Sequence, residues 1–283
     1  MKRLLEREQL LLDLRRIAKN NYILSKGESV EQYLKQMLKF IGDADAQLRD
    51  ELIYETFCEW ICDKAYVGDD ELRKMLAVLL DSSHLFSHIG NDGDHTVLTR
   101  SFSALVIVLV LMEHRKRAIL DADLFMQTRK AIIQYLMQEA DFRGYMPDCG
   151  WAHAAAHGAD MLDELVQCRE SDHTVLHEIL ACIKRILRNG RYMLCHEEDE
   201  RLARVAARVF DLHVSFRTHL QAWLEELTDY EGVKIERMRY LARVNAKNFV
   251  RSFYFRLLHG KTMDDNITLL ADIEKKMNRF VGR

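Results

Sequence analysis

The longest strongly apolar run of the chain lies in RSFSALVIVLVLME, residues 100–113. It extends from Ala104 to Met112 and is bounded by Arg100 and Glu113. A membrane-spanning helix needs about 20 consecutive apolar residues, so this run is too short to cross a bilayer. A helix that is apolar on all sides belongs in the interior of a protein. The run therefore predicts a buried central helix.

The composition of the rest of the chain favours the same class of structure. Of the 283 residues, 48% are hydrophobic, but only 12 are glycine and one is proline. Short strands and tight hairpins need more of these turn-forming residues, whereas the abundant Leu, Arg, Glu, Lys, Ala and Met have high helix propensity. The sequence thus predicts an all-α protein. It contains no phosphate loop, nucleophile elbow or dinucleotide motif.

Turn and capping residues divide the chain into about twelve helices. Ser29 followed by Gln32 fits a capping box, and Asp69, Asp94 and Asp121 precede further helical segments. The predicted helix starts lie near Lys2, Ser29, Ala46, Asp69, Asp94, Asp121, Gly150, Asp172, Glu197, Phe216, Glu231 and Asp264.

The spacing of these helices predicts how they are arranged. Helices joined by short connections favour antiparallel neighbours, and the pairs recur at about 40 to 50 residues, the scale of HEAT and armadillo repeats. We expect an irregular α-solenoid of antiparallel helix pairs, with a closed α/α toroid as the alternative. No Pro/Gly/Ser-rich linker divides the chain, so residues 1–283 are predicted to form a single helical-repeat domain.

Charge and the N-terminal sequence bear on location. The chain has 41 basic and 44 acidic residues, and a net charge of −3 gives no global attraction to nucleic acid or anionic membranes. Residues 1–20, MKRLLEREQLLLDLRRIAKN, lack the apolar core of a signal peptide. We therefore expect a cytoplasmic protein that does not bind membranes. Its six cysteines are expected to be reduced thiols, with Cys58 and Cys62 in the core.

The only proline lies in FRGYMPDCGWAHAAAHGADMLD, residues 142–163. Gly144, Pro147 and Gly150 predict a loop there, followed by a helix that starts near Gly150. Helical spacing would place four polar side chains of the new helix on one stripe: His153, His157, Asp160 and Glu164.

This stripe suggests a site. Two imidazoles one turn apart can hold a transition metal, so His153 and His157 are candidate ligands of a divalent metal. Ala154 stands where the metalloprotease motif has Glu, so a third ligand must come from another helix, and Asp160 is expected to orient His157. A solvated or groove-facing stripe without metal is the simpler alternative. Cys149 could be a stabilised thiolate or an inert thiol.

The same region resembles a known family. The resemblance lies in Arg143-Gly144-Tyr145, Gly150-Trp151-Ala152-His153 and Ala156-His157-Gly158-Ala159-Asp160, with weaker support from residues 100–105 and 198–203. These segments resemble the bacterial family catalogued as domain of unknown function 2785. The resemblance implies a helical, repeat-like protein that has no established activity, and Cys149 is not part of its pattern.

Three further groups of polar residues have two interpretations each. Arg100 could reach the groove of the histidines or could hold a neighbouring carboxylate or helix end. The acids from Glu197 to Glu200 could face the histidines or complement the dipole of their own helix. Residues 233–261 carry eight bases and one acid. Four of these bases could follow nucleic-acid phosphates or form a solvated face: Arg239, Arg243, Lys247 and Arg251.

The sequence favours a helical-repeat binding module, in which a polar groove binds a small polar ligand or a protein segment. Its candidate ligand-binding residues are Arg100, Arg143, Tyr145, Trp151, His153, His157 and Asp160. One alternative is a metal-dependent hydrolase in which His153 and His157 are metal ligands, or in which one of them is a general base. The other is nucleic-acid binding through the basic segment.

Overall fold

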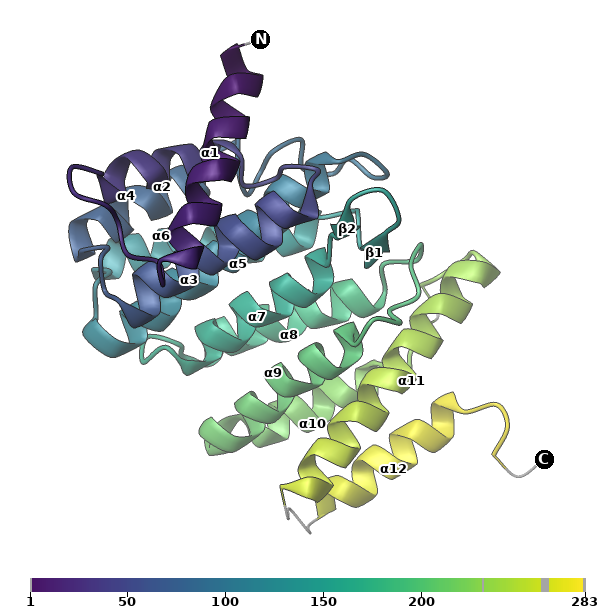
Figure 1. The fold of residues 1–283 in the computed structure, drawn as a ribbon. Helices are drawn as coiled ribbons and strands as arrows, with labels where there is room; N and C mark the ends of the chain where they lie inside the picture. Colours follow the sequence, from purple (N-terminus) through teal and green to yellow (C-terminus); the bar gives the residue numbers. More distant parts are fainter. Residues whose placement is uncertain (1, 231, 261–264, 282–283) are drawn as a thin grey trace.

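The computed structural model describes residues 2–230, 232–260 and 265–281. In these residues the chain is all-α apart from one short β-hairpin (Figure 1). The elements are α1 (Lys2–Lys19), α2 (Val30–Lys39), η1 (Gln47–Tyr54), α3 (Glu55–Cys58), η2 (Glu59–Asp63), α4 (Asp69–Leu79), α5 (Thr96–Arg117), α6 (Ala122–Gln138), β1 (Tyr145–Met146), β2 (Gly150–Trp151), α7 (Ala154–Gln167), α8 (His173–Leu187), α9 (Glu198–Leu212), η3 (Val214–Phe216), α10 (Arg217–Glu226), α11 (Glu236–His259) and α12 (Asp265–Met277).

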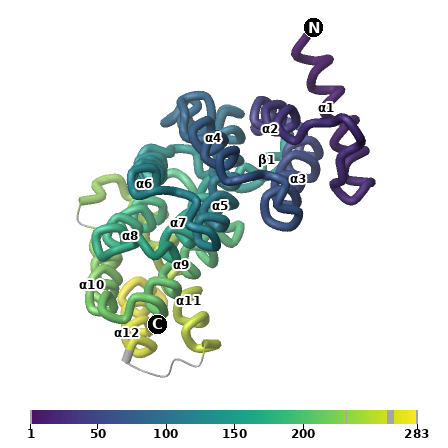
Figure 2. Tube along the Cα trace, turned by 90° about the vertical axis from the view of Figure 1, so that its left-hand side faces the viewer, coloured from purple at the N-terminus to yellow at the C-terminus, as the bar shows by residue number. Residues whose placement is uncertain are grey.

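The helices follow one another through space in the order of the sequence. Helices α5, α7, α9 and α11 form a series in which each packs against the next, and α12 packs against α11. Helix α6 contacts α7 and α8, and α8 contacts α9. Figures 1 and 2 show α1 at one end of the molecule and α12 at the other. The hairpin lies beside the start of α7, so its side chains lie close to the series of helices α5, α7, α9 and α11.

Helix α5 is the buried central helix that the apolar run predicts. Every residue from Arg100 to Leu111 is buried. By length and composition α5 could cross a membrane, the one helix of the described residues to pass that test, yet most of its apolar segment is buried against other helices. Its burial on all sides explains why apolar residues occupy all of its faces.

Several predicted caps are confirmed. The Oγ atom of Ser29 accepts a hydrogen bond from the backbone N–H of Gln32 at 3.4 Å. Asp121 accepts one from Leu124 at 2.8 Å, and Asp172 accepts one from Val175 at 3.0 Å. Each carboxylate satisfies a backbone N–H that has no partner inside its own helix.

Helix α4 starts at Asp69, as predicted, although its cap is Gly68 rather than Asp69. Two predicted starts near the C-terminal end of the chain have other outcomes. Helix α11 begins at Glu236, later than the predicted Glu231, and Glu231 lies outside the described residues. Asp264, the predicted start of the last helix, also lies outside them.

The largest local error of the sequence prediction concerns the hairpin. Gly150 was expected to start a helix, but it lies in β2, where it pairs with Met146. Helix α7 starts four residues later, because His153 has left-handed backbone angles (φ 53°, ψ 34°) that a helix cannot include. The sequence also did not predict the π-helical turns of η1 and η2.

All six cysteines are free thiols. Cys58 and Cys62 are partly buried and pack against the hydrophobic core, as expected from their helical spacing.

Candidate functional site

The β-hairpin that carries the predicted site is held from a distant part of the chain. Arg49 of η1 is fully buried, and its Nη2 atom donates to the backbone oxygen of Cys149 at 2.8 Å and of Trp151 at 3.4 Å. Its guanidinium also lies over the ring of Phe102, 4.7 Å from the ring centre. At Gly150, φ is +81°, a conformation that favours glycine. The hairpin is therefore fixed against η1 and α5.

His153 follows the hairpin directly and has an unsatisfied polar atom. Its Nε2 atom is buried and has no hydrogen-bond partner among the described residues. Burial lowers the pKa of His153 to about 4, and the charges of nearby Arg201 and His196 act in the same direction. At neutral pH the imidazole is therefore uncharged, with one nitrogen as a donor and the other as an acceptor.

His157 lies one turn further along α7 and is buried. Its Nδ1 atom lies 2.7 Å from the hydroxyl oxygen of Ser101, and that hydroxyl donates to the backbone oxygen of Ala152. Since the hydroxyl hydrogen is already used, Nδ1 must be the donor and Nε2 keeps its lone pair. Burial, followed by the nearby His153, lowers the pKa of His157 well below its usual value. This imidazole is neutral as well.

A third histidine, His196, lies beside His153 and was not among the residues predicted from the sequence. The ring of His196 lies 6.2 Å from that of His153 and 5.4 Å from that of Trp151. Gly144 makes room for it, because a Cβ atom at residue 144 would lie 2.2 Å from Nδ1 of His196. Glu198 is buried and accepts a hydrogen bond from the backbone N–H of His196 at 2.7 Å. Two features of the sequence could have indicated a role for His196. They are the motif Arg143-Gly144-Tyr145 and the acidic residues that follow residue 196.

Two aromatic residues of the hairpin connect these histidines to solvent. The rings of Trp151 and His153 are 4.2 Å apart, and those of Trp151 and Tyr145 are 5.0 Å apart. Tyr145 and Trp151 are 53% and 40% exposed, whereas His157 is 6% exposed. The cluster thus runs from the surface into the interior. We call it the His–Trp cluster, and it consists of Tyr145, Trp151, His153, His157 and His196.

The groove expected around this cluster stays a prediction. A cavity of about 600 Å³ lies at the C-terminal ends of α5 and α7, between residues 112–118 and 167–170, and includes no residue of the His–Trp cluster.

Asp160 does not have the role that the sequence suggested. It was expected to orient His157, but its carboxylate pairs with Arg201 and Arg204 of α9. Burial raises the pKa of Asp160, although both guanidinium groups oppose this effect. Asp163 pairs with Arg208 at 3.4 Å across the same interface. Asp160 therefore joins α7 to α9, and it brings Arg201 close to the histidines.

Arg100 and Arg143 hold neighbouring segments together. Arg100 is fully buried and pairs with the fully buried Glu139 through two contacts of 2.6 and 2.8 Å. The sequence left this carboxylate pairing open as one of two interpretations. Arg143 pairs with Asp141 at 2.6 Å and donates to the backbone oxygen of Asp94. Both guanidinium groups are thus engaged by protein acceptors outside the His–Trp cluster.

The basic segment is partly covered by neighbouring helices. Arg243 is buried, and its Nη1 atom donates to the backbone oxygen of Met277 at 2.8 Å. Arg251 pairs with Glu274 at 2.6 Å. Burial lowers the pKa of Lys247, and the charges of Arg251 and Arg243 add to this effect. Arg239 is exposed and donates to the backbone oxygen of Val233 at 2.8 Å, while Lys261 lies outside the described residues.

The fold and the site define an all-α protein in which a short β-hairpin carries two exposed aromatic residues beside two neutral histidines, the half-buried His153 and the buried His157. The chain belongs to the DUF2785 family of proteins of unknown function, whose family model matches residues 85–255. The match extends from the segment before α5 into α11 and includes the whole His–Trp cluster. It confirms the resemblance seen in the sequence. The comparisons with curated proteins and with solved structures found no match.

Proposed function

We propose that the protein is a binding module of the cytosol whose His–Trp cluster binds a small polar ligand or a segment of another protein. One observation carries this proposal: the Nε2 atom of His153 is buried without a hydrogen-bond partner among the described residues, beside the exposed Trp151. An unsatisfied buried polar atom costs about 1 to 3 kcal/mol, so a ligand that completes the hydrogen bond recovers this free energy.

The chemistry of the cluster indicates what it would bind. Neutral His153 and His157 offer hydrogen-bond donors and acceptors without charge. Trp151 and Tyr145 offer exposed aromatic surface on which an apolar face of a ligand can pack. Arg201 is near enough to lower the pKa of both histidines, so it adds positive charge at the edge of the cluster. A ligand with hydroxyl or amide groups and one flat apolar face fits these features.

The metal-dependent hydrolase has less support. Among the described residues, the one group of three donor side chains with ligand atoms within 4.8 Å of one another is His95, Asp148 and Cys149, which includes neither His153 nor His157. A general base works best with a pKa near the working pH, and His153, with a pKa of about 4, is a weak base at neutral pH.

We further propose that the helices form an irregular α-solenoid. The support is the order of packing, in which α5, α7, α9 and α11 each contact the next member of the series. In such an array, the hairpin before α7 is an insertion that places binding residues along one side of the stack.

A fragment screen tests the binding proposal. A library of polar fragments with hydroxyl and amide groups would be screened by isothermal titration calorimetry against the full chain. His153→Asn removes the imidazole and keeps a residue type that tolerates left-handed backbone angles. The matched control is His219→Asn, which changes an exposed histidine of α10. Fragments that bind the wild type and the control, but bind His153→Asn at least about tenfold more weakly, support the proposal. Equal affinities for all three proteins contradict it.

A further inference from the structure

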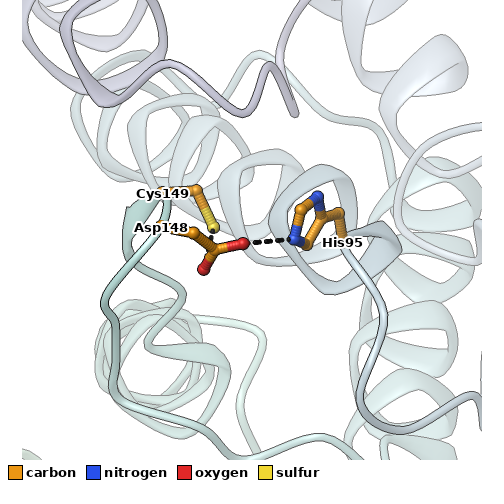
Figure 3. A group of neighbouring side chains, drawn as sticks. All are labelled: His95, Asp148 and Cys149. Atoms are coloured by element: carbon orange, nitrogen blue, oxygen red, sulfur yellow. Dashed lines mark hydrogen bonds and ion pairs between the residues drawn. The ribbon is translucent and has the colours of Figure 1, made fainter.

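A second group of side chains meets at the turn of the hairpin. His95 precedes α5, and Asp148 and Cys149 lie between β1 and β2. Their imidazole nitrogen, carboxylate oxygen and thiol sulfur lie within 4.8 Å of one another. Figure 3 shows the imidazole of His95 facing the carboxylate of Asp148, with the thiol of Cys149 beside that carboxylate. None of these three residues belongs to the His–Trp cluster.

The distances within this group are close to those of a metal site. The Nε2 atom of His95 lies 2.9 Å from one oxygen of Asp148, and the Sγ atom of Cys149 lies 3.5 Å from the other. In a tetrahedral zinc site with bonds of about 2.0 to 2.3 Å, neighbouring donor atoms are about 3.3 to 3.8 Å apart. These two contacts involve different oxygens of Asp148. With one donor atom taken from each residue, the three atoms lie within 4.8 Å of one another, so rotation of the exposed His95 and Asp148 side chains can bring them to this spacing.

Both sides of the group are held in place by other residues. Arg49 donates to the backbone oxygen of Cys149 at 2.8 Å, and Arg143 donates to the backbone oxygen of Asp94, the residue before His95. These hydrogen bonds fix the backbone on each side of the group. They do not involve the imidazole nitrogen, the carboxylate oxygen or the thiol sulfur that would bind a metal. A preformed arrangement reduces the entropy that is lost when a ligand binds.

Two of the three side chains are exposed, so an ion can reach the group from solvent. The side chains of His95 and Asp148 are 53% and 61% exposed, whereas Cys149 is 4% exposed. An ion from solvent can therefore reach the imidazole and the carboxylate while the sulfur lies at the inner side of the group. A water molecule can complete the coordination on the exposed side.

We propose that His95, Asp148 and Cys149 form a zinc-binding site. A set of one nitrogen, one oxygen and one sulfur donor suits Zn²⁺, whereas Ca²⁺ and Mg²⁺ bind mainly to oxygen. On binding, the thiol of Cys149 releases its proton to solvent, and the thiolate and the carboxylate together balance the charge of the ion. The fourth ligand is water. Because positions 95 and 148 come from different elements, the ion joins the hairpin to the start of α5.

Another group of histidines is the main competitor for metal. His173 and His177 of α8 and His219 of α10 are exposed, and the ring centres of the first two lie 5.8 and 5.2 Å from that of His219. This group contains no thiol. A readout that depends on a metal–sulfur bond therefore distinguishes metal bound at Cys149 from metal bound at this histidine group.

The test is a titration of the metal-free full chain with Co²⁺, followed by displacement with Zn²⁺. Cobalt bound to a thiolate gives a sulfur-to-metal charge-transfer band in the near ultraviolet, and Zn²⁺ removes it. We expect one equivalent of Co²⁺ to give this band. We expect Cys149→Ser to abolish it and His95→Ala to weaken binding at least about tenfold. The shape-preserving Asp148→Asn is a third variant, in case one of the others fails to fold by circular dichroism.

Matched controls locate the site. Cys195→Ser changes an exposed thiol beside His196, and His177→Ala changes the competing group. Both controls should keep the band with unchanged affinity. Absence of the band in the wild type, its persistence in Cys149→Ser, or its loss in Cys195→Ser overturns the proposal. His153→Asn should also keep the band, so the zinc site and the ligand-binding proposal succeed or fail separately.

Discussion

The Nδ1 atom of His157 lies 2.7 Å from the hydroxyl oxygen of Ser101, and both side chains are buried. The same hydroxyl donates to the backbone oxygen of Ala152, which lies between the hairpin and α7. One side chain of α5 therefore sets the tautomer of His157 and also holds the end of the hairpin. This hydroxyl links the central helix to the His–Trp cluster.

Ser101→Ala should destabilise the protein by about 1 to 3 kcal/mol, because the backbone oxygen of Ala152 loses its side-chain donor and the Nδ1 atom of His157 keeps only its longer contact of 3.3 Å with the backbone oxygen of Ser101. Urea unfolding followed by circular dichroism measures this change. The control is Ser103→Ala: Ser103 is also buried, but its hydroxyl donates to the backbone oxygen of Thr99 in its own helix at 2.7 Å. Its loss should cost less than about 1 kcal/mol. Equal losses for the two variants would contradict the role of Ser101.

Gly144→Ala should displace His196 from Trp151, since the added Cβ atom would lie 2.2 Å from the imidazole of His196. That side chain can move, so we expect a larger effect on fragment binding than on the free energy of unfolding. Gly68→Ala is the control, because a Cβ atom at Gly68 meets nothing within 4 Å. Calorimetry with the same fragments measures both variants. Unchanged binding in Gly144→Ala would show that His196 is not needed at that place.

Glu139→Gln should cost about 3 to 5 kcal/mol, because it leaves the fully buried guanidinium of Arg100 without its counter-charge. The exposed pair of Arg251 and Glu274 offers a comparison, and Glu274→Gln should cost less than about 1 kcal/mol. Chemical unfolding of both variants gives the two values. A small loss for Glu139→Gln would mean that the buried pair is not a main support of the fold.

Stability should fall as the pH is lowered from about 6.5 toward about 4. In the folded state the pKa of His153 is lowered to about 4 from an ordinary value near 6.5, so in this window the unfolded chain binds a proton that the folded chain excludes. The stabilisation is complete above the unfolded pKa and is lost as the pH drops through the window, by up to about 1.4 kcal/mol per pH unit.

Unfolding in urea at several pH values measures this dependence. The profile of His153→Asn should be flatter than that of the wild type, because one titrating group is gone while His157 remains. Parallel profiles would mean that His153 titrates normally in the folded protein.

Local signals in the sequence were sufficient to predict much of the fold. The apolar run predicted α5, and Ser29 and Asp121 predicted helix starts, because a cap depends on residues only three positions apart. The start of α7 could not be predicted in this way. His153 takes left-handed angles while its backbone N–H donates to the backbone oxygen of Arg143 across the hairpin. Such a contact depends on tertiary structure.

The candidate site was predicted in part. The structure places His153 and His157 together, as their spacing indicated, and Trp151 lies beside His153, although helical spacing would have put it on the packed side. His196 was missed because only the folding of the loop before α9 brings it to Trp151. Asp160 was given the wrong partner, since the packing of α7 against α9 that brings Arg201 to it cannot be read from spacing within one helix.

Imidazole nitrogen NMR during fragment titration tests the central claim most directly. In protein labelled with ¹⁵N-histidine, the signals of His153 at neutral pH should be those of a neutral ring, and a binding fragment should shift the Nε2 signal of His153 while the exposed His219 stays unchanged. A charged ring at His153, or fragments that bind without moving its signals, would contradict the account of the His–Trp cluster as a ligand-binding site.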